Sequence, residues 1–257
     1  ATQLSINAVC KERKIIFNSI SQSDAINEIK DWSVYTFHEA LNPHMTAGAL
    51  ARYAIPRFGK KIVFLTADYA YGHEMVRAFE RAGKEVVVTS DYSVALEAEG
   101  LVVPGVGAYG ACMQGLKSIR GDQLVRERIA LKRPTLGICV GMQILFASGV
   151  EHGTHPGVGI WSATVEKLNA PIAPHMGWNT VTAPVGSSLF AGVEDQSFYF
   201  VHSYAVKEKV SALSTMANYG EDFLAAIEDG AISATQFHPE KSGDAGLALI
   251  KNWTSSL

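Results

Sequence analysis

The 257-residue sequence has few cysteines, no excess of basic residues and no long apolar run. Its cysteines are Cys10, Cys112 and Cys139, an odd and sparse set that excludes a disulfide framework and favours a reducing cytoplasm. A formal net charge of −3 offers no basic surface for nucleic acid. No apolar run approaches the ~20 residues that span a bilayer, and the first residues carry no recognisable secretion signal, so we expect no membrane segment and no export.

What the sequence does contain is an alternation of short β-branched runs with segments of helical length. We expect buried strands at 14–19, 61–66, 85–90 and 100–105, and helices at 46–55, 74–83, 123–132 and 141–148. This alternation predicts an α/β fold with a mostly parallel sheet and helices on both faces. From about residue 158 the segments are typical of antiparallel strands, so we expect an added antiparallel β layer in the C-terminal half.

The segment "TLGICVGMQ" (135–143) puts Cys139 between Gly137 and Gly141, after an apolar run. A strand, a Gly-x-Cys-x-Gly turn and a helix make the layout of a nucleophile elbow, with cysteine in place of serine. The glycines suit a tight, strained turn, and the amide groups at the start of the helix favour a thiolate. The alternative is a buried, inert cysteine, which apolar runs commonly contain.

A second motif, "TQFHPEKSG" (235–243), supplies the groups that a reactive cysteine needs. His238 follows an expected strand, and within hydrogen-bond reach of Cys139 it would take the thiol proton and later protonate a leaving amine. Glu240 would hold the imidazole in the right tautomer, and Pro239 restricts the chain between them. A strand-end histidine with a structural hydrogen bond is the alternative.

A third motif is the glycine-rich turn in "VVPGVGAYGACM" (102–113), which also follows an expected strand. Such a turn exposes backbone N–H groups. The amides of Gly107 and Val140 would together form an oxyanion hole for a tetrahedral intermediate. An ordinary strand-to-helix turn is the alternative.

The motifs PGVGAYG, GICVGMQ and QFHPEKSG, in this order and spacing, resemble those of class I glutamine amidotransferases. Within that class, "PHMGWN" (174–179), "YFVHSYAV" (199–206) and "KSGDAGLALIKNW" (241–253) resemble the glutaminase subunits of imidazole glycerol phosphate synthase, an enzyme of histidine biosynthesis. The resemblance covers about residues 74–257. It implies a flavodoxin-like sheet, a glutaminase activity without a cofactor, and a heterodimer.

This resemblance implies a role for each motif residue. Cys139 would attack the side-chain amide of glutamine and form a glutamyl thioester, with His238 shuttling protons and Glu240 orienting it. Gly107 and Val140 would supply the oxyanion donors. The residues implied to contact the bound glutamine are Gln143, His202, Ser203 and Tyr204.

The resemblance also implies a partner. The released ammonia would pass to a cyclase subunit, a (β/α)8 barrel, which uses it to make imidazole glycerol phosphate. The residues implied to lie at the subunit interface are His175, Met176, Gly177, Trp178 and Asn179. Trp178 is the kind of aromatic residue that anchors an interface, and a core tryptophan is the alternative.

The front of the chain departs from this family. Asp68, Tyr69 and Gly72 match part of the Asp-Tyr-Gly-x-Gly-Asn turn with which the family opens, but the Gly-Asn pair is missing. His73 stands where the asparagine is expected. Residues 8–73 resemble instead part of one lobe of a periplasmic binding protein of the branched-chain amino-acid or amide type.

These two resemblances lead to the hypothesis of a chimera. Residues 1–60 would form an α/β segment derived from the binding protein and residues 61–257 the amidotransferase domain, with the strand at 61–66 shared between them. A catalytically impaired chimera that acts only as a binding or scaffold protein is the alternative function, and a glutaminase of another pathway is a more distant one. We expect no metal, because His152 and His155 lack companion ligands.

Overall fold

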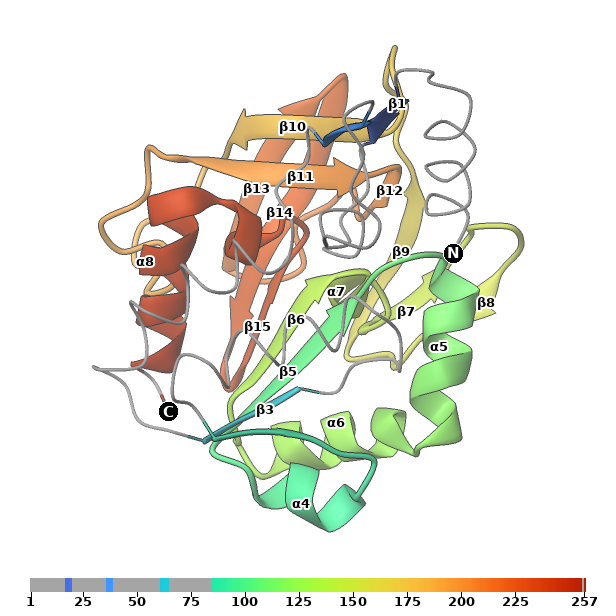
Figure 1. Ribbon diagram of the computed structural model, residues 1–257, viewed down its shortest axis with the longest axis vertical. Coiled ribbons are helices and arrows are strands. Elements are labelled where there is room, and N and C mark those ends of the chain that lie inside the picture. The colour runs from blue at the N-terminus through green and yellow to red at the C-terminus, as the bar shows by residue number, and fades with distance from the viewer. Residues whose placement is uncertain (1–16, 20–35, 39–60, 65–84, 256) are drawn as a thin grey trace.

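The computed structural model describes residues 17–19, 36–38, 61–64, 85–255 and 257 (Figure 1). The expected helices at 46–55 and 74–83, the turn at 68–73 and most of the front segment lie outside these residues. Among the residues that are described, no helix has both the length and the apolar character that crossing a membrane requires.

A seven-stranded sheet forms the centre of the described structure, with the strand order β13-β14-β15-β6-β5-β3-β4. Its strands are β3 (Lys61–Phe64), β4 (Glu85–Val88), β5 (Gly100–Gly105), β6 (Thr135–Cys139), β13 (Leu213–Tyr219), β14 (Glu221–Asp229) and β15 (Ile232–Thr235). The strands from β15 to β4 run parallel, whereas β13 and β14 add antiparallel pairs beside β15. The expected α/β fold with a mostly parallel sheet is confirmed.

The neighbouring strands β5 and β6 carry two of the three motifs at their ends. Every residue of β6 is buried, and all but one residue of β5 are buried. Continuous burial of this kind needs cover on both faces of the sheet, which is why these runs are apolar throughout rather than alternating. Because the strands are parallel and Gly105 pairs with Cys139, their carboxyl ends bring the glycine-rich turn next to the elbow.

Helices pack on this sheet. They are α4 (Tyr92–Glu97), α5 (Tyr109–Ser118), α6 (Gly121–Ala130) and α8 (Gly243–Thr254). In Figure 1, α8 lies to the left of the sheet, and α5 and α6 lie to its lower right. Asp91 caps α4 by accepting hydrogen bonds from the N–H groups of Ser93 and Val94. The helix expected at 123–132 is α6, which begins two residues earlier.

The added antiparallel layer is present, in two small sheets. One contains β7 (Phe146–Gly149), β8 (His155–Pro156), β9 (Trp161–Lys167) and β12 (Tyr204–Ala205). The other is a ribbon of β10 (His175–Thr180) and β11 (Ser197–His202), in which His175 pairs directly with His202. Most pairs in this layer are antiparallel, and the pair β7–β9 is parallel.

The helix expected at 141–148 is wrong over most of its length. Helix α7 spans only Val140–Gln143, and the chain then enters β7. All residues from Ile144 to Phe146 are apolar and fully buried. The spacing of apolar residues therefore does not distinguish a helix from a strand in this run. Long-range pairing decides the outcome, because the carbonyls of Ile144 and Leu145 accept hydrogen bonds from the loop before β9. The elbow helix is therefore a single turn.

The described strands of the front segment do not all belong to one sheet. β1 (Phe17–Ser19) and β2 (Thr36–His38) form a separate two-stranded parallel sheet. β3 lies in the central sheet, between β4 and β5. Of these three strands, β3 is the one that joins the sheet carrying the motifs.

Candidate active site

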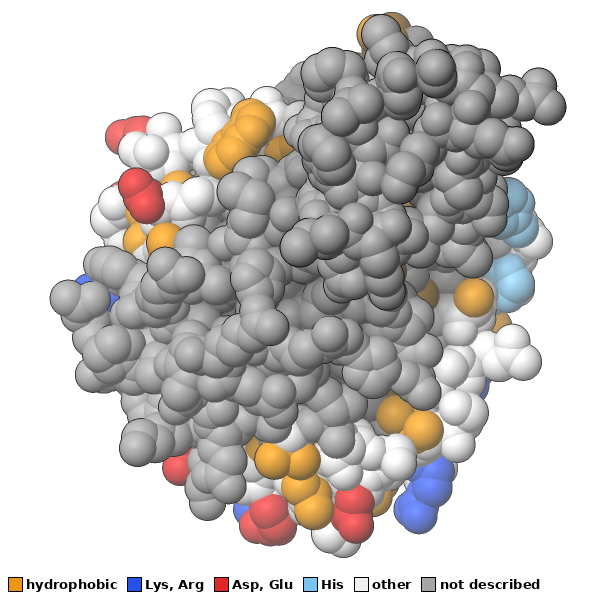
Figure 2. Space-filling model, in the orientation of Figure 1, with side chains coloured by type: hydrophobic (Ala, Val, Ile, Leu, Met, Phe, Trp, Pro, Cys, Tyr) orange, Lys and Arg blue, Asp and Glu red, His pale blue; other side chains and the backbone are white. Residues whose placement is uncertain are grey.

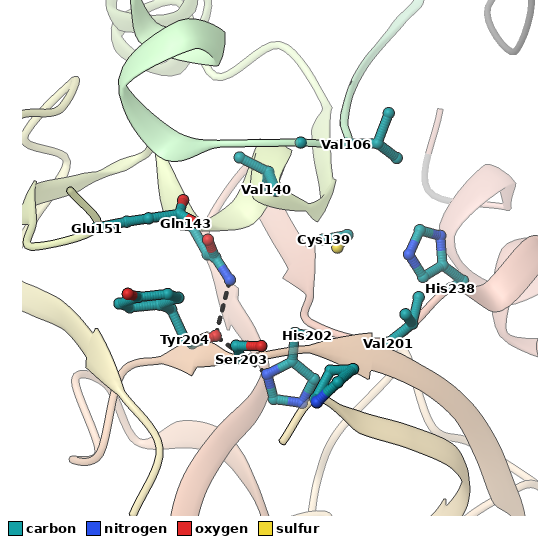
Figure 3. A pocket seen from close by; sticks show the side chains of 12 residues that line it. Val106, Cys139, Val140, Gln143, Glu151, Val201, His202, Ser203, Tyr204 and His238 are labelled. Carbon is teal, nitrogen blue, oxygen red and sulfur yellow. Dashed lines mark hydrogen bonds between the residues drawn. The ribbon is translucent and has the colours of Figure 1, made fainter. Parts of the chain in front are cut away.

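A pocket of about 400 Å³ opens at the carboxyl ends of β5 and β6 (Figure 3). It gathers side chains and backbone from the loop after β5, the elbow, the end of β11 and the segment after β15. The residues named from the sequence that line it are Gly107, Cys139, Val140, Gln143, His202, Ser203, Tyr204 and His238. Segments that are far apart in the sequence thus meet at one hollow whose volume suits a small molecule.

The turn at Cys139 is strained, as a nucleophile elbow requires. Cys139 has φ 56° and ψ −116°, an unfavourable conformation for a residue with a side chain. Gly141 is needed there because a Cβ atom at this position would lie 1.8 Å from the Val103 carbonyl oxygen. A Cβ atom on Gly105 would lie 2.4 Å from the Gly141 nitrogen. Strand β5 therefore passes so close to the elbow that only glycine fits at Gly105 on the strand and at Gly141 on the elbow.

His238 is held rigidly just beyond β15. Its backbone N–H donates to the Tyr199 carbonyl, and its carbonyl accepts from the Ser242 hydroxyl at 2.7 Å. Pro239 starts a short 3-10 turn that brings Glu240 back toward the ring. The Nδ1 atom of His238 lies 2.6 Å from the Glu240 carboxylate, and both side chains are buried.

The electrostatics favour a charged imidazole at His238. Burial by itself lowers the pKa of this histidine, but the Glu240 carboxylate and the Cys139 sulfur outweigh burial and raise the pKa of His238 to about 9. Figure 3 shows the sulfur of Cys139 on the side of the imidazole that faces the pocket. The Glu240 carboxylate therefore holds the Nδ1 side of the imidazole, and Cys139 lies near enough to His238 to favour its charged form.

The family model for class-I glutamine amidotransferases matches residues 65–255. The chain belongs to this family. A HisH subunit of imidazole glycerol phosphate synthase from Mycobacterium bovis is 55% identical over 205 residues, which cover 77% of this chain and 98% of the relative. The HisH subunit from Streptomyces coelicolor is 50% identical over 226 residues, covering 83% of this chain and all of the relative (100%).

The fold comparison agrees. A crystal structure of a glutamine amidotransferase superposes with a TM-score of 0.58 at 18% identity, covering 76% of this chain and 99% of that one. The expected amidotransferase fold and the expected resemblance to synthase glutaminase subunits are both confirmed. The chain is a glutamine amidotransferase of the HisH family, which serves histidine biosynthesis.

A pair of hydrogen-bonded glutamines lies beside Cys139, and one of them, Gln143, lines the amidotransferase pocket. The Gln143 amide nitrogen donates to the Tyr204 carbonyl at 2.8 Å and to the Gln236 side-chain oxygen at 3.0 Å. The amide nitrogen of Gln236 in turn points at the Cys139 sulfur from 3.9 Å. Sequence reasoning missed Gln236, although its place two residues before His238 in one extended segment was a usable signal.

Four residues that line the amidotransferase pocket were also missed. They are Val106, Glu151, Pro174 and Val201. Glu151 accepts a hydrogen bond from the Tyr109 N–H at 2.7 Å, which ties the loop after β7 to the start of α5. Val106 lies beside Gly107 in the glycine-rich motif, whereas nothing in the local sequence singles out Glu151, Pro174 or Val201, because the antiparallel layer carries these three to the pocket. Within the described part of the chain, no three potential ligands of the His, Cys, Asp or Glu type gather as a metal site needs.

The strand implied as the interface, β10, is exposed on one side only. Met176 and Trp178 are 52% and 55% exposed, so Trp178 is not a core residue. Trp178 also meets Tyr199 edge to face, with ring centroids 6.1 Å apart. His175, in contrast, is 3% exposed and stacks on Tyr219, which removes its side chain from the surface. The expectation that residues 175–179 lie at a subunit interface stays a prediction, in which Met176 and Trp178, not His175, expose their side chains.

Proposed function

We propose that this amidotransferase hydrolyses glutamine at Cys139 and delivers the ammonia to a cyclase partner that makes imidazole glycerol phosphate. The observation that carries the proposal is the buried His238–Glu240 pair beside the strained Cys139, in a pocket lined by the other motif residues. A positioned base next to a thiol is what amide cleavage by a cysteine requires.

The first half of the reaction makes a thioester. Because the raised pKa of His238 favours a protonated ring, the Cys139 proton is already on His238 when the sulfur, as a thiolate, bonds to the side-chain carbonyl carbon of glutamine. The negative charge that develops on oxygen is stabilised by the backbone amides of Gly107 and Val140. When the carbon–nitrogen bond breaks, His238 returns the proton to the nitrogen, which leaves as ammonia.

The second half restores the enzyme. His238 removes a proton from water, the hydroxide oxygen bonds to the thioester carbon, and the carbon–sulfur bond breaks. Glutamate leaves, and the sulfur regains its proton. Throughout both halves Glu240 holds the Nδ1–H of His238, which keeps the other ring nitrogen directed at the reacting atoms. No step needs a metal or a cofactor.

The substrate contacts proposed for Gln143 and for the segment from His202 to Tyr204 are supported by their position around the pocket. Backbone groups of an extended segment suit the α-amino and carboxylate groups of an amino acid, which need an acceptor and donors, respectively. The Gln143 side chain, one helical turn after the nucleophile, faces the same space (Figure 3).

The proposed partner is a (β/α)8-barrel cyclase that binds at β10 to form a heterodimer. Support comes from the exposed Met176 and Trp178 on a strand whose neighbour, β11, ends at the pocket residue His202. Figure 2 shows hydrophobic side chains at the surface over this part of the molecule. Docking here would set the partner beside the source of ammonia. A cytoplasmic location fits this role and the sparse cysteines.

The front of the chain is proposed to be a fused segment that resembles a periplasmic binding protein over about residues 8–73. The match to the Mycobacterium bovis relative accounts for 98% of that protein but only 77% of this chain, which supports a segment beyond the amidotransferase. The proposed domains are residues 1–60 and 61–257. The position of β3 in the central sheet supports a strand shared between the two parts.

The test is glutamine hydrolysis by the full chain, with and without a cyclase subunit. We expect Cys139→Ala to abolish hydrolysis, and a glutamine-like electrophile to label the unchanged chain covalently at Cys139 and nowhere else. Cys112→Ala is the matched control, because Cys112 is half-buried on α5 with its pKa raised to about 11 by burial and is not expected to react. An unlabelled Cys139 together with no hydrolysis in the presence of the cyclase would favour the impaired chimera.

A further inference from the structure

Two buried histidines, His175 and His202, form a hydrogen-bonded chain that neither the elbow nor the His238–Glu240 pair explains. They face each other across the β10–β11 ribbon, and the Nδ1 atom of His175 lies 3.0 Å from the Nε2 atom of His202. The Nδ1 atom of His202 lies 3.0 Å from the Tyr204 carbonyl oxygen. That same carbonyl accepts the amide of Gln143 in the active-site pocket.

The Tyr204 carbonyl fixes the direction in which the hydrogen bonds of this chain are donated. A carbonyl oxygen only accepts, so the proton of His202 must be on Nδ1. In a neutral imidazole the other nitrogen, Nε2, is then an acceptor. His175 must therefore donate from its Nδ1 atom, which leaves the Nε2 atom of His175 as an acceptor.

Asn179, at the opposite end of the hydrogen-bonded chain, independently requires the same direction of donation. The Asn179 side-chain oxygen accepts from the Thr180 N–H at 2.9 Å, and its amide nitrogen donates to the Asn218 carbonyl at 2.9 Å. These two bonds fix which way the Asn179 amide is turned. Its nitrogen lies 3.4 Å from the Nε2 atom of His175, so that atom faces a donor and has to accept. Both ends thus require the Nδ1–H tautomer of both histidines.

The surroundings keep both rings neutral. Burial lowers the pKa of His175 to about 4 and, with the nearby His175 and His238, lowers the pKa of His202 to about 3. A second proton on either ring would also place an N–H group opposite another N–H donor, either on His175 or on Asn179. Stacking of His175 on Tyr219 and Phe200, at centroid distances of 4.0 and 4.8 Å, holds its ring plane.

We propose that His175 and His202 are positioning residues for the glutaminase reaction, acting as a pair of neutral Nδ1–H imidazoles that hold the Tyr204 carbonyl and, through it, the Gln143 side chain. The inference rests on the proposed function, because the proposed glutaminase reaction supplies the substrate that Gln143 would contact. It also links β10, the proposed partner strand, to the pocket by direct hydrogen bonds. Neither histidine touches the reacting atoms.

The first test reads the tautomers directly and needs no activity. The full chain, labelled with ¹⁵N at its eight histidines, is examined by NMR at pH 7, where nitrogen shifts distinguish Nδ1–H, Nε2–H and charged rings. Resonances that disappear in His175→Phe and His202→Asn assign the two rings. We expect both in the Nδ1–H form. An Nε2–H or a charged ring at either position overturns the proposal, and it does so whether or not Cys139 proves to be the nucleophile.

The second test separates positioning from packing with two variants of one residue. His175→Phe keeps the stacked ring but removes the donor to His202. His175→Asn keeps an amide nitrogen at the place of Nδ1 but loses the ring. If the hydrogen-bonded chain positions Gln143, His175→Phe raises the KM for glutamine about tenfold and changes kcat less than about threefold. The reason is that the buried Nε2 atom of His202 loses the donor on His175.

His175→Asn is then expected to keep the KM within about threefold while lowering the Tm more than the phenylalanine variant does. The reverse pattern, a normal KM in His175→Phe and a raised KM in His175→Asn, means that only packing matters and overturns the proposal. Both variants are assayed as the full chain with the cyclase subunit. Loss of all activity in Cys139→Ala tests the proposed function separately.

Discussion

His238 combines complete burial with a raised pKa because Glu240 and Cys139 flank its ring. Burial disfavours a charged imidazole, so the ring depends on its carboxylate neighbour at 2.6 Å to stay protonated. The folded-state pKa of about 9 lies above the ordinary value of 6.5, so the protonated ring stabilises the fold. That contribution is complete below about pH 6.5 and is lost as the pH rises through 9.

The first prediction for a single residue follows from this linkage. Glu240→Gln should lower the stability at pH 6 by about 3 kcal/mol, because a buried ion pair is broken, and should lower kcat by about 100-fold. Urea unfolding between pH 6 and pH 9 should show the free energy of unfolding of the unchanged chain falling with pH, and a flatter curve for the variant. Parallel curves would mean that His238 is not the group that titrates.

At the scale of an element, the elbow depends on how closely β5 passes the one-turn helix α7. The Gly141 position leaves no room for a Cβ atom, since the Val103 carbonyl would be 1.8 Å away. Cys139 takes its strained backbone because β6 on one side and α7 on the other are both buried and cannot shift. The packing of the central sheet therefore maintains the strained backbone of Cys139.

The prediction for this element is that Gly141→Ala destabilises the chain by about 3 kcal/mol and abolishes covalent labelling of Cys139. Gly115→Ala is the matched control, because a Cβ atom on this glycine of α5 would meet nothing within 4 Å. The control should be neutral or stabilised by up to about 1 kcal/mol. Thermal unfolding and mass spectrometry of labelled protein measure both effects, and equal effects in the two variants would contradict the close-approach argument.

At the scale of the whole molecule, the proposed catalytic groups and the exposed face of β10 lie in one region. The β10–β11 ribbon joins them, since β11 ends at the pocket while Met176 and Trp178 of β10 are exposed. Helix α4 lies at the other end of the molecule in Figure 1. A partner that docks on β10 would therefore act on the pocket without reaching α4.

We accordingly predict that Trp178→Ala weakens binding of the cyclase subunit at least about tenfold, because a large exposed aromatic at an interface is a typical anchor. Val94→Ala is the control, since Val94 is a 43% exposed apolar residue on α4. Calorimetric titration of the full chain with the cyclase gives both affinities. Unchanged affinity in Trp178→Ala, or an equal loss in Val94→Ala, would place the interface elsewhere.

The sequence by itself indicated strands β3 to β6 and β15 of the central sheet, the elbow at Cys139 and the His238–Glu240 pair, because each depends on neighbours within a few residues. Only the tertiary structure decided what depends on distant pairing: β7 in place of a helix after Gln143, and the burial of His175 against Tyr219. The same holds for the contact of Gln236 with Cys139. Local spacing encodes a turn or a motif, whereas strand partners and burial emerge only when segments far apart in the chain pack together.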